Sequence, residues 1–277
     1  MNRIGILRHP KIAAAEPLAV QVSTWLQERD VAAWIEASWD KSDIEEYLTD
    51  TSLLIVLGGD GSLLRAARLG MPHHIPVLGI NMGRVGFLTE AQLDDWQMRL
   101  ERVLGGDYWL EKRLMAHATL WRRDHSLNQF IALNDVVIGR GAQARVLHLE
   151  LCVDGDVVTT YTADALIVAT PTGSTAYSMA AGGPLLPPQL QNFVVVPVAA
   201  HLSLDRALVL HEEAEITIRV QMDHEATLTA DGQEGAALEP GDRIVITKHD
   251  EYATFIRVDN AGYFYRRLLQ RLGFLRG

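Results

Sequence analysis

Short apolar runs alternate with amphipathic stretches along roughly the first 110 residues of the chain. Apolar runs predict buried β-strands, and apolar residues spaced three or four positions apart predict helices with one buried face. The predicted strands cover residues 4–7, 31–35, 53–57 and 75–80. One predicted helix contains Leu18, Val22, Trp25 and Leu26 at helical spacing. The other predicted helices cover residues 44–48, 62–68 and 94–104. This alternation is typical of an α/β domain with an open, Rossmann-like parallel sheet.

The pattern changes beyond about residue 112. Residues 146–153 and 216–220 alternate apolar with polar side chains, and Asp154-Gly155-Asp156 is typical of a hairpin turn. A predominantly β domain is therefore expected. Residues 263–272 return to helical spacing, so this helix is expected to pack back on the first domain. The expected division is an α/β domain at 1–112, a β-rich domain at 113–255, and a segment at 256–277 that returns to the first domain.

The composition is that of a folded protein of a reducing compartment. The 277 residues are 48% hydrophobic, enough for a substantial core, and Cys152 is the only cysteine, so an internal disulfide is excluded and a cytoplasmic location is expected. Arg8, Lys11 and Glu16 interrupt the N-terminal apolar residues, and no later run is long enough to span a bilayer, so neither a signal peptide nor a membrane partner is expected. The net charge of −10 argues against nucleic acid as a partner, because clustered lysine and arginine are what bind its phosphates.

The turn Gly58-Gly59-Asp60-Gly61 follows a predicted buried strand and precedes a predicted helix. Open α/β sheets bind ligands at this position, where glycines let the backbone approach a phosphate and the helix N-terminus attracts its charge. A carboxylate there is repelled by phosphates unless it takes a proton from an attacking hydroxyl, holds a metal ion or caps the helix. A glycine turn with an aspartate near the start of a helix is also common in α/β proteins where it has no role in binding or catalysis. It is neither a P-loop nor the Rossmann glycine fingerprint.

Three further segments carry candidate chemistry. Residues 161–178 form an apolar strand that enters a loop dense in hydroxyl groups, which offers many small hydrogen-bond donors or is a solvated turn. Asn134-Asp135 either opens a strand or bonds to ribose hydroxyls. Residues 230–234 are more typical of a hairpin turn than of a site. His73-His74 has no acidic or sulfur neighbour in sequence, so it is interpreted as a loop, and no residue is assigned to a metal site.

These motifs resemble those of the NAD kinase family, and the resemblance runs through most of the chain. The family is marked by the Gly-Gly-Asp-Gly turn, by an Asn-Gly/Arg-x-Gly-Phe-Leu stretch that residues 81–89 match loosely, and by an Asn followed by an acid, as in Asn134-Asp135. Its Thr-Pro-Thr-Gly-Ser-Thr-Ala-Tyr-Ser sequence is present unchanged at residues 170–178. The glycine turn alone is shared with diacylglycerol kinases, sphingosine kinases and phosphofructokinases. The loop at 170–178 is not, so that loop carries the resemblance.

The resemblance implies a kinase that transfers the terminal phosphate of ATP, or of inorganic polyphosphate, to the 2′-hydroxyl of the adenosine ribose of NAD, giving NADP. A divalent cation, expected to be Mg²⁺, would assist, and Asp60 would be the general base. Relatives form dimers and tetramers, so a homodimer or homotetramer is expected. The expected phosphate- and NAD-binding residues are Gly61, Arg65, Asn134, Asp135, Arg145, Thr162, Asp164, Thr175, Ala176, Tyr177, Ser178 and Gln233. Thr162 and Ala165 depart from the residues usual in the family, which affects contact details and not the chemistry.

Two other functions stay open at this point. A lipid kinase built on the same turn would need an apolar acceptor pocket or a membrane-facing patch, and the sequence shows neither a basic amphipathic helix nor an aromatic cluster to supply one. A sensor that binds NAD or NADP without turnover has no need of Asp60 beside anionic phosphates, although a capping or metal-holding role would keep an aspartate there.

Overall fold

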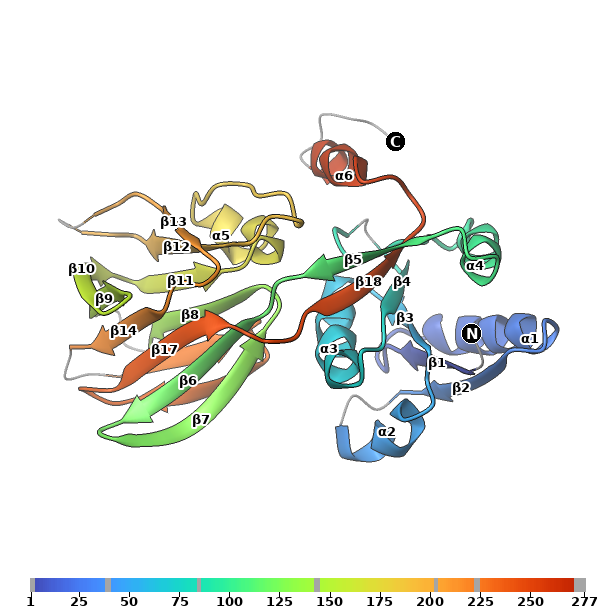
Figure 1. Ribbon diagram of the computed structural model, residues 1–277, viewed down its shortest axis with the longest axis horizontal. Coiled ribbons are helices and arrows are strands. Elements are labelled where there is room, and N and C mark those ends of the chain that lie inside the picture. Colours follow the sequence, from blue (N-terminus) through green and yellow to red (C-terminus); the bar gives the residue numbers. More distant parts are fainter. Residues whose placement is uncertain are drawn as a thin grey trace. The chain divides into compact units, whose positions relative to one another are not determined.

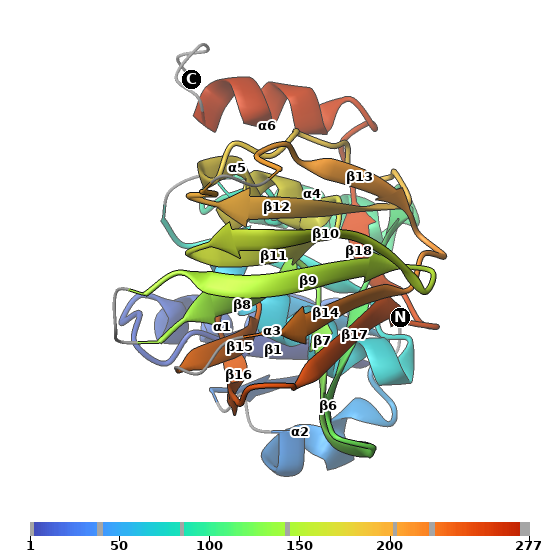
Figure 2. The ribbon, with the colours of Figure 1, turned by 90° about the vertical axis from the view of Figure 1, so that its left-hand side faces the viewer.

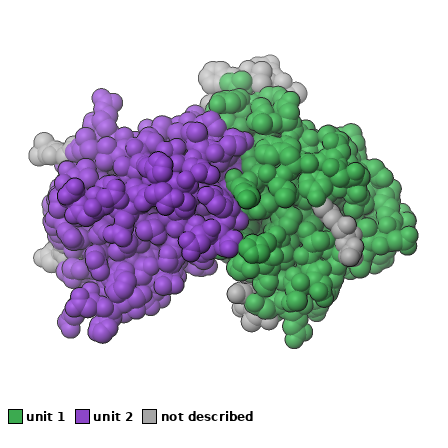
Figure 3. Space-filling view, viewed as in Figure 1, with its two compact units in different colours: residues 1–112, 253–277 green, residues 113–252 purple. Residues whose placement is uncertain are grey.

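The chain divides into two compact units. In the computed structural model, unit 1 contains residues 1–112 and 253–277, and unit 2 contains residues 113–252 (Figure 3). The structure describes residues 3–37, 41–83, 86–141, 145–201, 204–221 and 225–271. Arg84 and Val85 of the 81–89 motif, and Leu272 of the predicted C-terminal helix, lie outside the described residues.

Unit 1 is built on a six-stranded sheet with the strand order β2-β1-β3-β4-β18-β5 (Figure 1). The pairs β1–β2, β1–β3, β3–β4 and β4–β18 are parallel. The central strand β3 is buried along its whole length, as expected for a parallel strand with both faces covered. The predicted α/β domain with a parallel sheet is therefore confirmed. The strands are β1 (Arg3–Arg8), β2 (Ala32–Glu36), β3 (Leu53–Gly58), β4 (Val77–Asn81), β5 (Trp109–Arg113) and β18 (Ala253–Arg257).

Helices cover both faces of this sheet. The helices of unit 1 are α1 (Ala15–Gln27), α2 (Lys41–Leu48), α3 (Asp60–Gly70), the short η1 (Met71–His73), α4 (Trp96–Leu104) and α6 (Tyr263–Arg271). Helices α1 and α4 share one buried core with Ile55 and Ile80. Gly79 faces the opposite side, because neighbouring residues of a strand alternate in direction, and a Cβ there would lie 2.5 Å from Leu63 of α3. None of the helices in the described ranges is both long and apolar enough to cross a membrane.

The chain re-enters unit 1 through β18 and α6. Tyr263 and Phe264 of α6 pack against Phe87, which follows β4. The Tyr263 hydroxyl also donates to the Glu111 carboxylate of β5 at 2.9 Å. The prediction that the C-terminal helix packs back on the first domain is confirmed by these contacts.

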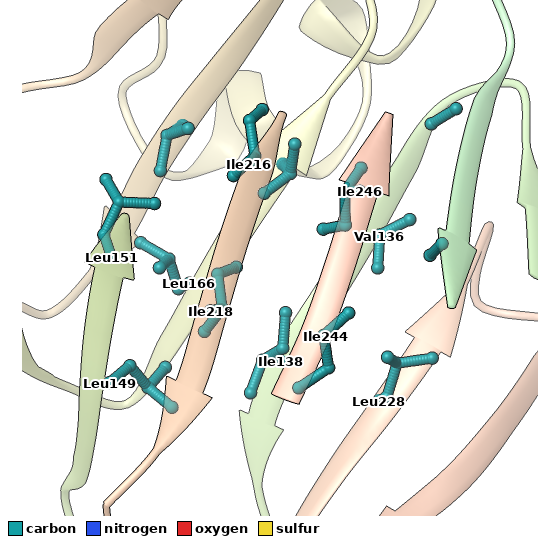
Figure 4. Close-up of a cluster of buried hydrophobic side chains, with 14 of the residues drawn as sticks. Val136, Ile138, Leu149, Leu151, Leu166, Ile216, Ile218, Leu228, Ile244 and Ile246 are labelled. Atoms are coloured by element: carbon teal, nitrogen blue, oxygen red, sulfur yellow. The ribbon is translucent and has the colours of Figure 1, made fainter. Parts of the chain in front are cut away.

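Unit 2 consists of two six-stranded antiparallel sheets. One has the order β10-β9-β14-β17-β6-β7 and the other the order β13-β12-β11-β8-β15-β16, of which β12, β11 and β8 can be followed in Figure 2. Apolar side chains of both sheets form one core, with Ile138 and Leu166 from the second sheet and Leu149, Ile218 and Ile244 from the first (Figure 4). The predicted β-rich domain is confirmed.

The strands of unit 2 are β6 (Ala116–Arg122), β7 (His125–Ala132), β8 (Asp135–Arg140), β9 (Leu147–Val153), β10 (Asp156–Ala163), β11 (Ala165–Ala169), β12 (Asn192–Val198), β13 (Leu208–His211), β14 (Ile216–Val220), β15 (Ala226–Ala230), β16 (Glu234–Leu238) and β17 (Arg243–Lys248). Two short helical turns follow β11, η2 (Thr172–Thr175) and α5 (Tyr177–Ala180). The hydroxyl-rich segment is thus the connection that leaves a fully buried strand.

Candidate functional site

Asp60 is the first residue of α3 and lies just beyond the carboxyl end of β3. The sequence predicts that this helix begins at Ser62, whereas it begins at Asp60, because Gly59 takes the extended N-cap conformation (φ −103°, ψ −169°). Strands β3 and β4 run parallel, so their carboxyl ends meet at one edge of the sheet. This edge is where open α/β sheets bind ligands.

The Asp60 carboxylate is held by the backbone of the segment that follows β4. Phe87 N donates to Oδ2 at 3.0 Å and Leu88 N donates to Oδ1 at 2.9 Å. Gly86 makes this approach possible, because a Cβ at that position would lie 2.1 Å from Asp60 Oδ1. The N-cap residue of α3 is Gly59, so Asp60 does not occupy the capping position of its helix. Its carboxylate is instead fixed by the Gly-Phe-Leu part of the 81–89 motif.

Arg271, the last residue of α6, is a further partner of Asp60. Its Nη1 lies 3.4 Å from Asp60 Oδ2, and its guanidinium lies over the Phe87 ring, 4.9 Å from the ring centre. Sequence reasoning missed this residue because the helix was identified from its apolar positions. A charged residue 211 positions away from Asp60 gives no local signal.

A buried ion-pair network anchors the segment that holds Asp60. Arg257 is fully buried; it donates to Leu88 O at 2.9 Å, to Glu90 at 3.2 Å and to Glu111 at 2.8 Å. Burial alone lowers the pKa of Arg257, but Tyr263, Glu111 and Glu90 raise it by more, so the guanidinium stays charged. This network, too, gave no signal in the sequence.

Arg267 ties α6 to the same segment. Its guanidinium donates to Thr89 O and lies 3.5 Å from the Glu90 carboxylate. Glu90 in turn accepts backbone hydrogen bonds from Val258 at 2.8 Å and from Asp259 at 3.0 Å. The backbone that directs Asp60 is therefore fixed by three elements, β5, β18 and α6.

Gly61 and Arg65 lie on α3, the helix that Asp60 begins. They are four positions apart and therefore on one face of the helix, and both are exposed. A Cβ at Gly61 would meet no atom of the described residues within 4 Å. His73 and His74 lie at the end of η1 and beyond it, and His73 Nε2 is 3.7 Å from Glu45.

In unit 2 the structure brings Asn134 together with the loop of residues 170–178. Thr170 N donates to Asn134 O at 2.8 Å, and Thr170 Oγ1 donates to Leu133 O. Gly173 lies so close that a Cβ there would be 2.0 Å from Asn134 O. Two motifs that are far apart in the sequence thus form one surface at the ends of β8 and β11.

Asp231 joins the β15–β16 turn to the same place. Its carboxylate accepts hydrogen bonds from Asn134 N at 2.7 Å and Leu133 N at 3.0 Å. The hairpin interpretation of residues 230–234 is confirmed, because β15 ends at Ala230 and β16 begins at Glu234. Gln233 lies in this turn, and its backbone N donates to Ala230 O at 3.0 Å. The structural role of Asp231 was not recognised in the sequence.

Asp135 is a buried acid beside Asp231. It is 5% exposed and opens β8. Burial, and then the negative charge of Asp231, raise the pKa of Asp135 to about 7. Near neutral pH the carboxyl group is therefore partly protonated, and in that form it can donate a hydrogen bond as well as accept one.

The hydroxyl groups of the 170–178 loop serve mainly to fold the loop itself. Ser174 Oγ donates to Pro171 O at 2.7 Å and Thr175 Oγ1 donates to Thr172 O at 3.1 Å, and these side chains are buried. The expectation that the loop offers many free hydroxyl donors is corrected accordingly, because these hydroxyls bond to backbone carbonyls of η2 and its flanks.

The end of the loop is different. Tyr177 is 45% exposed and Ala176 is partly exposed. Ser178 is buried, and its Oγ has no hydrogen-bond partner within the described part of the chain. Ala176 and Tyr177 are therefore accessible at this end of the loop, whereas the Ser178 hydroxyl is an unsatisfied buried group.

Thr162 and Asp164 lie at the other end of β11. That strand has five residues, which at about 3.3 Å per residue is roughly 17 Å. Asp164 pairs with Arg140 at 3.4 Å, and Thr162 Oγ1 lies 3.2 Å from His148 Nδ1. Arg145 is exposed just before β9. The structure therefore does not bring these residues together with Thr175–Ser178 within one chain, and their part in binding stays a prediction.

The fold and the site are those of a two-domain phosphotransferase. Its Gly-Gly-Asp-Gly turn places a fixed carboxylate at the carboxyl edge of a parallel sheet. Family models agree with this. The model described as the ATP-NAD kinase N-terminal domain matches residues 35–108, and the ATP-NAD kinase C-terminal domain matches residues 133–258.

Curated relatives match the chain over nearly its whole length. An NAD kinase of Chloroflexus aurantiacus (strain ATCC 29366 / DSM 635 / J-10-fl) is 40% identical over 272 residues, which is 98% of this chain and 99% of the relative. An NAD kinase of Syntrophotalea carbinolica is 40% identical over 273 residues, which is 95% of this chain and 96% of the relative. The chain belongs to the NAD kinase family.

Two solved structures share the fold. An NAD kinase from Archaeoglobus fulgidus in complex with ATP has a TM-score of 0.79 and 25% identity, covering 99% of this chain and 100% of that one. Yeast NADH kinase complexed with NADH has a TM-score of 0.88 and covers 100% of this chain and 89% of that one. At 23% identity, the yeast structure supports the fold alone.

Proposed function

We propose that this chain transfers the terminal phosphoryl group of ATP to the 2′-hydroxyl of the adenosine ribose of NAD, giving NADP and ADP, with Asp60 as general base. The observation that carries the assignment of the base is the fixed direction of the Asp60 carboxylate. Its two oxygens bond to the amides of Phe87 and Leu88, at the ligand-binding edge of the sheet. A base held this way needs no reorganisation before it accepts a proton.

In the proposed step Asp60 takes the proton of the 2′-hydroxyl while the ribose oxygen bonds to the γ-phosphorus of ATP. The bond between the γ-phosphorus and the oxygen that bridges it to the β-phosphorus breaks, and ADP leaves with that electron pair. The exposed N-terminal turn of α3, with Gly61 and Arg65 on one face, supports a role for this helix in binding the phosphates. Positioning and electrostatic stabilisation account for most of the rate in such transfers.

A divalent cation, expected to be Mg²⁺, fits this proposal as a companion of ATP and not as a resident of a protein cage. Among the described residues, no group of three or more His, Cys, Asp or Glu is placed to hold a metal ion. Mg²⁺ is commonly bound through substrate phosphates plus one or two carboxylates, and in this proposal the phosphates of ATP hold it. When bound, the ion would neutralise charge on the phosphates.

For NAD, we propose a site in unit 2 that contains Asn134, Asp135, Ala176, Tyr177 and Ser178. The loop that carries the last three residues bonds to Asn134 through Thr170. The partly protonated acid and unpartnered hydroxyl of this site suit ribose and amide groups, which both donate and accept hydrogen bonds. We propose further contacts to NAD from Gln233, Thr175, Thr162, Asp164 and Arg145. We also propose a cytoplasmic location, which the single cysteine favours, and a homodimer or homotetramer, which the resemblance implies.

The activity can be tested directly. The purified protein is incubated with NAD, ATP and magnesium, and NADP is followed with a coupled NADP-dependent dehydrogenase. Formation of NADP is the expected result, and polyphosphate in place of ATP tests the second donor. Retention of bound NAD without any NADP would contradict the proposed function and favour the sensor.

Asp60→Asn tests the base. The amide keeps the size of the side chain but cannot accept the proton, so kcat is expected to fall about 10²- to 10⁴-fold while the Kd for NAD changes little. Asp94→Asn, at an exposed position of the same unit, is the matched control. A turnover of Asp60→Asn close to that of the wild type would remove Asp60 as the base and leave the kinase assignment standing.

A further inference from the structure

The Asp60 carboxylate is not held by backbone amides alone. An ionised carboxylate has about four sites that can accept hydrogen bonds, two on each oxygen. Among the described residues, Oδ2 accepts from Phe87 N and from the Arg271 guanidinium, whereas Oδ1 accepts from Leu88 N. Oδ1 is therefore the oxygen with an accepting site left for a substrate hydroxyl.

Arg271 is itself held in place. Its guanidinium lies over the face of Phe87, the residue whose amide also bonds to Asp60. Arg271 lies four positions after Arg267, so both arginines project from the same side of α6. Arg267 is anchored on the Thr89 carbonyl and stacks on Tyr263, 5.0 Å from its ring centre. Helix α6 is thus anchored at Arg267, and its last turn places the Arg271 cation against the Asp60 carboxylate.

We propose that Arg271 is a positioning residue for the general base, which rests on the function proposed above. It occupies Oδ2, so that Oδ1 is the atom that faces the 2′-hydroxyl and accepts its proton. Its positive charge also offsets the repulsion between the Asp60 carboxylate and the anionic phosphates that must come close for transfer. The turn near Asp60 and the last turn of α6 therefore work as one unit.

The test compares Arg271→Met and Arg271→Lys with the wild type. Methionine keeps much of the apolar stem but has no charge and no donor, so kcat is expected to fall about 10- to 100-fold, with KM for NAD and for ATP changed less than about threefold. Lysine restores a cation with donors and is expected to recover at least half of the loss on a logarithmic scale. Arg266→Met, an exposed arginine of the same helix that bonds only to the Asn260 side chain among the described residues, is the control and should keep wild-type turnover.

A second comparison separates positioning from direct phosphate binding. If Arg271 acts through Asp60, adding Arg271→Met to Asp60→Asn causes little further loss, because the group it positions is already inactive. A full additional loss together with a raised KM for ATP would overturn the proposal in favour of a phosphate contact. Wild-type kcat in Arg271→Met would also overturn it.

The tests of Arg271 can be distinguished from the tests of the kinase activity and of Asp60. Absence of NADP from the wild-type protein contradicts the function, and normal turnover of Asp60→Asn contradicts the base. Circular dichroism and thermal melting of each variant identify misfolding. Should Arg271→Met melt early, Arg271→Gln, which keeps a hydrogen-bond donor without the charge, is expected to lose rate to a similar extent, and wild-type kcat in that variant would overturn the role of the charge.

Discussion

At the scale of single residues, the direction of the Asp60 carboxylate, the proposed general base, depends on the absence of a side chain at Gly86. Gly86 leaves the space that Asp60 Oδ1 occupies, since a Cβ would come within 2.1 Å of that oxygen. Asp60 has little freedom to retreat, because the Phe87 and Leu88 amides bind both of its oxygens. An added methyl group must therefore displace the carboxylate or the segment that carries the amides.

Gly86→Ala is accordingly expected to lower kcat about 10- to 100-fold, because small displacements of a reacting group are costly in rate. Gly83→Ala is the matched control, since a Cβ there would meet nothing within 4 Å. The coupled assay for NADP measures both. Equal turnover in the two variants would show that Asp60 tolerates displacement, and would contradict the importance of its direction.

Residues that act through their neighbours in sequence were predictable, and residues that act across the fold were not. Asp60 was identified because a glycine turn between a strand and a helix is a local pattern. Asp231 bonds to Asn134 from 97 positions away, and Arg271 bonds to Asp60 from 211 positions away. A single sequence contains no signal for such pairs, because their spacing reflects tertiary folding and not local geometry.

At the scale of elements, a buried charge cluster joins β5, β18 and α6 to the segment that directs Asp60. Arg257, Glu90 and Glu111 are each almost wholly removed from water. Removing one partner of a buried ion pair leaves the others uncompensated, which typically costs about 3–5 kcal/mol. The hydrophobic periodicity of the sequence also did not predict the position of strand β18, because its place beside β4 is decided by pairing between distant segments.

Arg257→Met is therefore expected to lower the free energy of unfolding by about 3–5 kcal/mol. Urea denaturation followed by circular dichroism measures the change, with Lys112→Met on the exposed side of β5 as control. Adding Glu111→Gln to Arg257→Met should recover part of the loss, because it removes a buried negative charge that Arg257 no longer offsets. A further loss of similar size on adding Glu111→Gln would contradict this account of the cluster.

At the scale of the whole molecule, an acidic protein has to bind anionic substrates. The chain carries a formal charge of −10, so long-range attraction does not favour NAD or ATP. We propose that local groups do so instead, namely the N-terminus of α3 and the exposed Arg65, while the Arg271 cation offsets the charge of Asp60.

The stability of the molecule should also depend on pH through Asp135. The pKa of this acid is about 7 in the folded chain, against an ordinary value of 3.8, so between about pH 4 and pH 7 the folded state binds more protons than the unfolded state. The free energy of unfolding therefore falls as pH rises through this window and levels off above it. At 1.36 kcal/mol per pKa unit the contribution is at most about 4 kcal/mol.

Asp135→Asn cannot ionise and should lose less stability than the wild type between pH 5 and pH 8. Urea unfolding at several pH values measures the difference, and groups common to both proteins cancel in it. Asp156→Asn, at an exposed position of the same unit, should follow the wild-type curve. Parallel curves for Asp135→Asn and the wild type would mean that Asp135 titrates normally. A gap that widens as pH rises would instead mean that charging Asp135, which is buried beside the partly exposed Asp231, destabilises the folded chain.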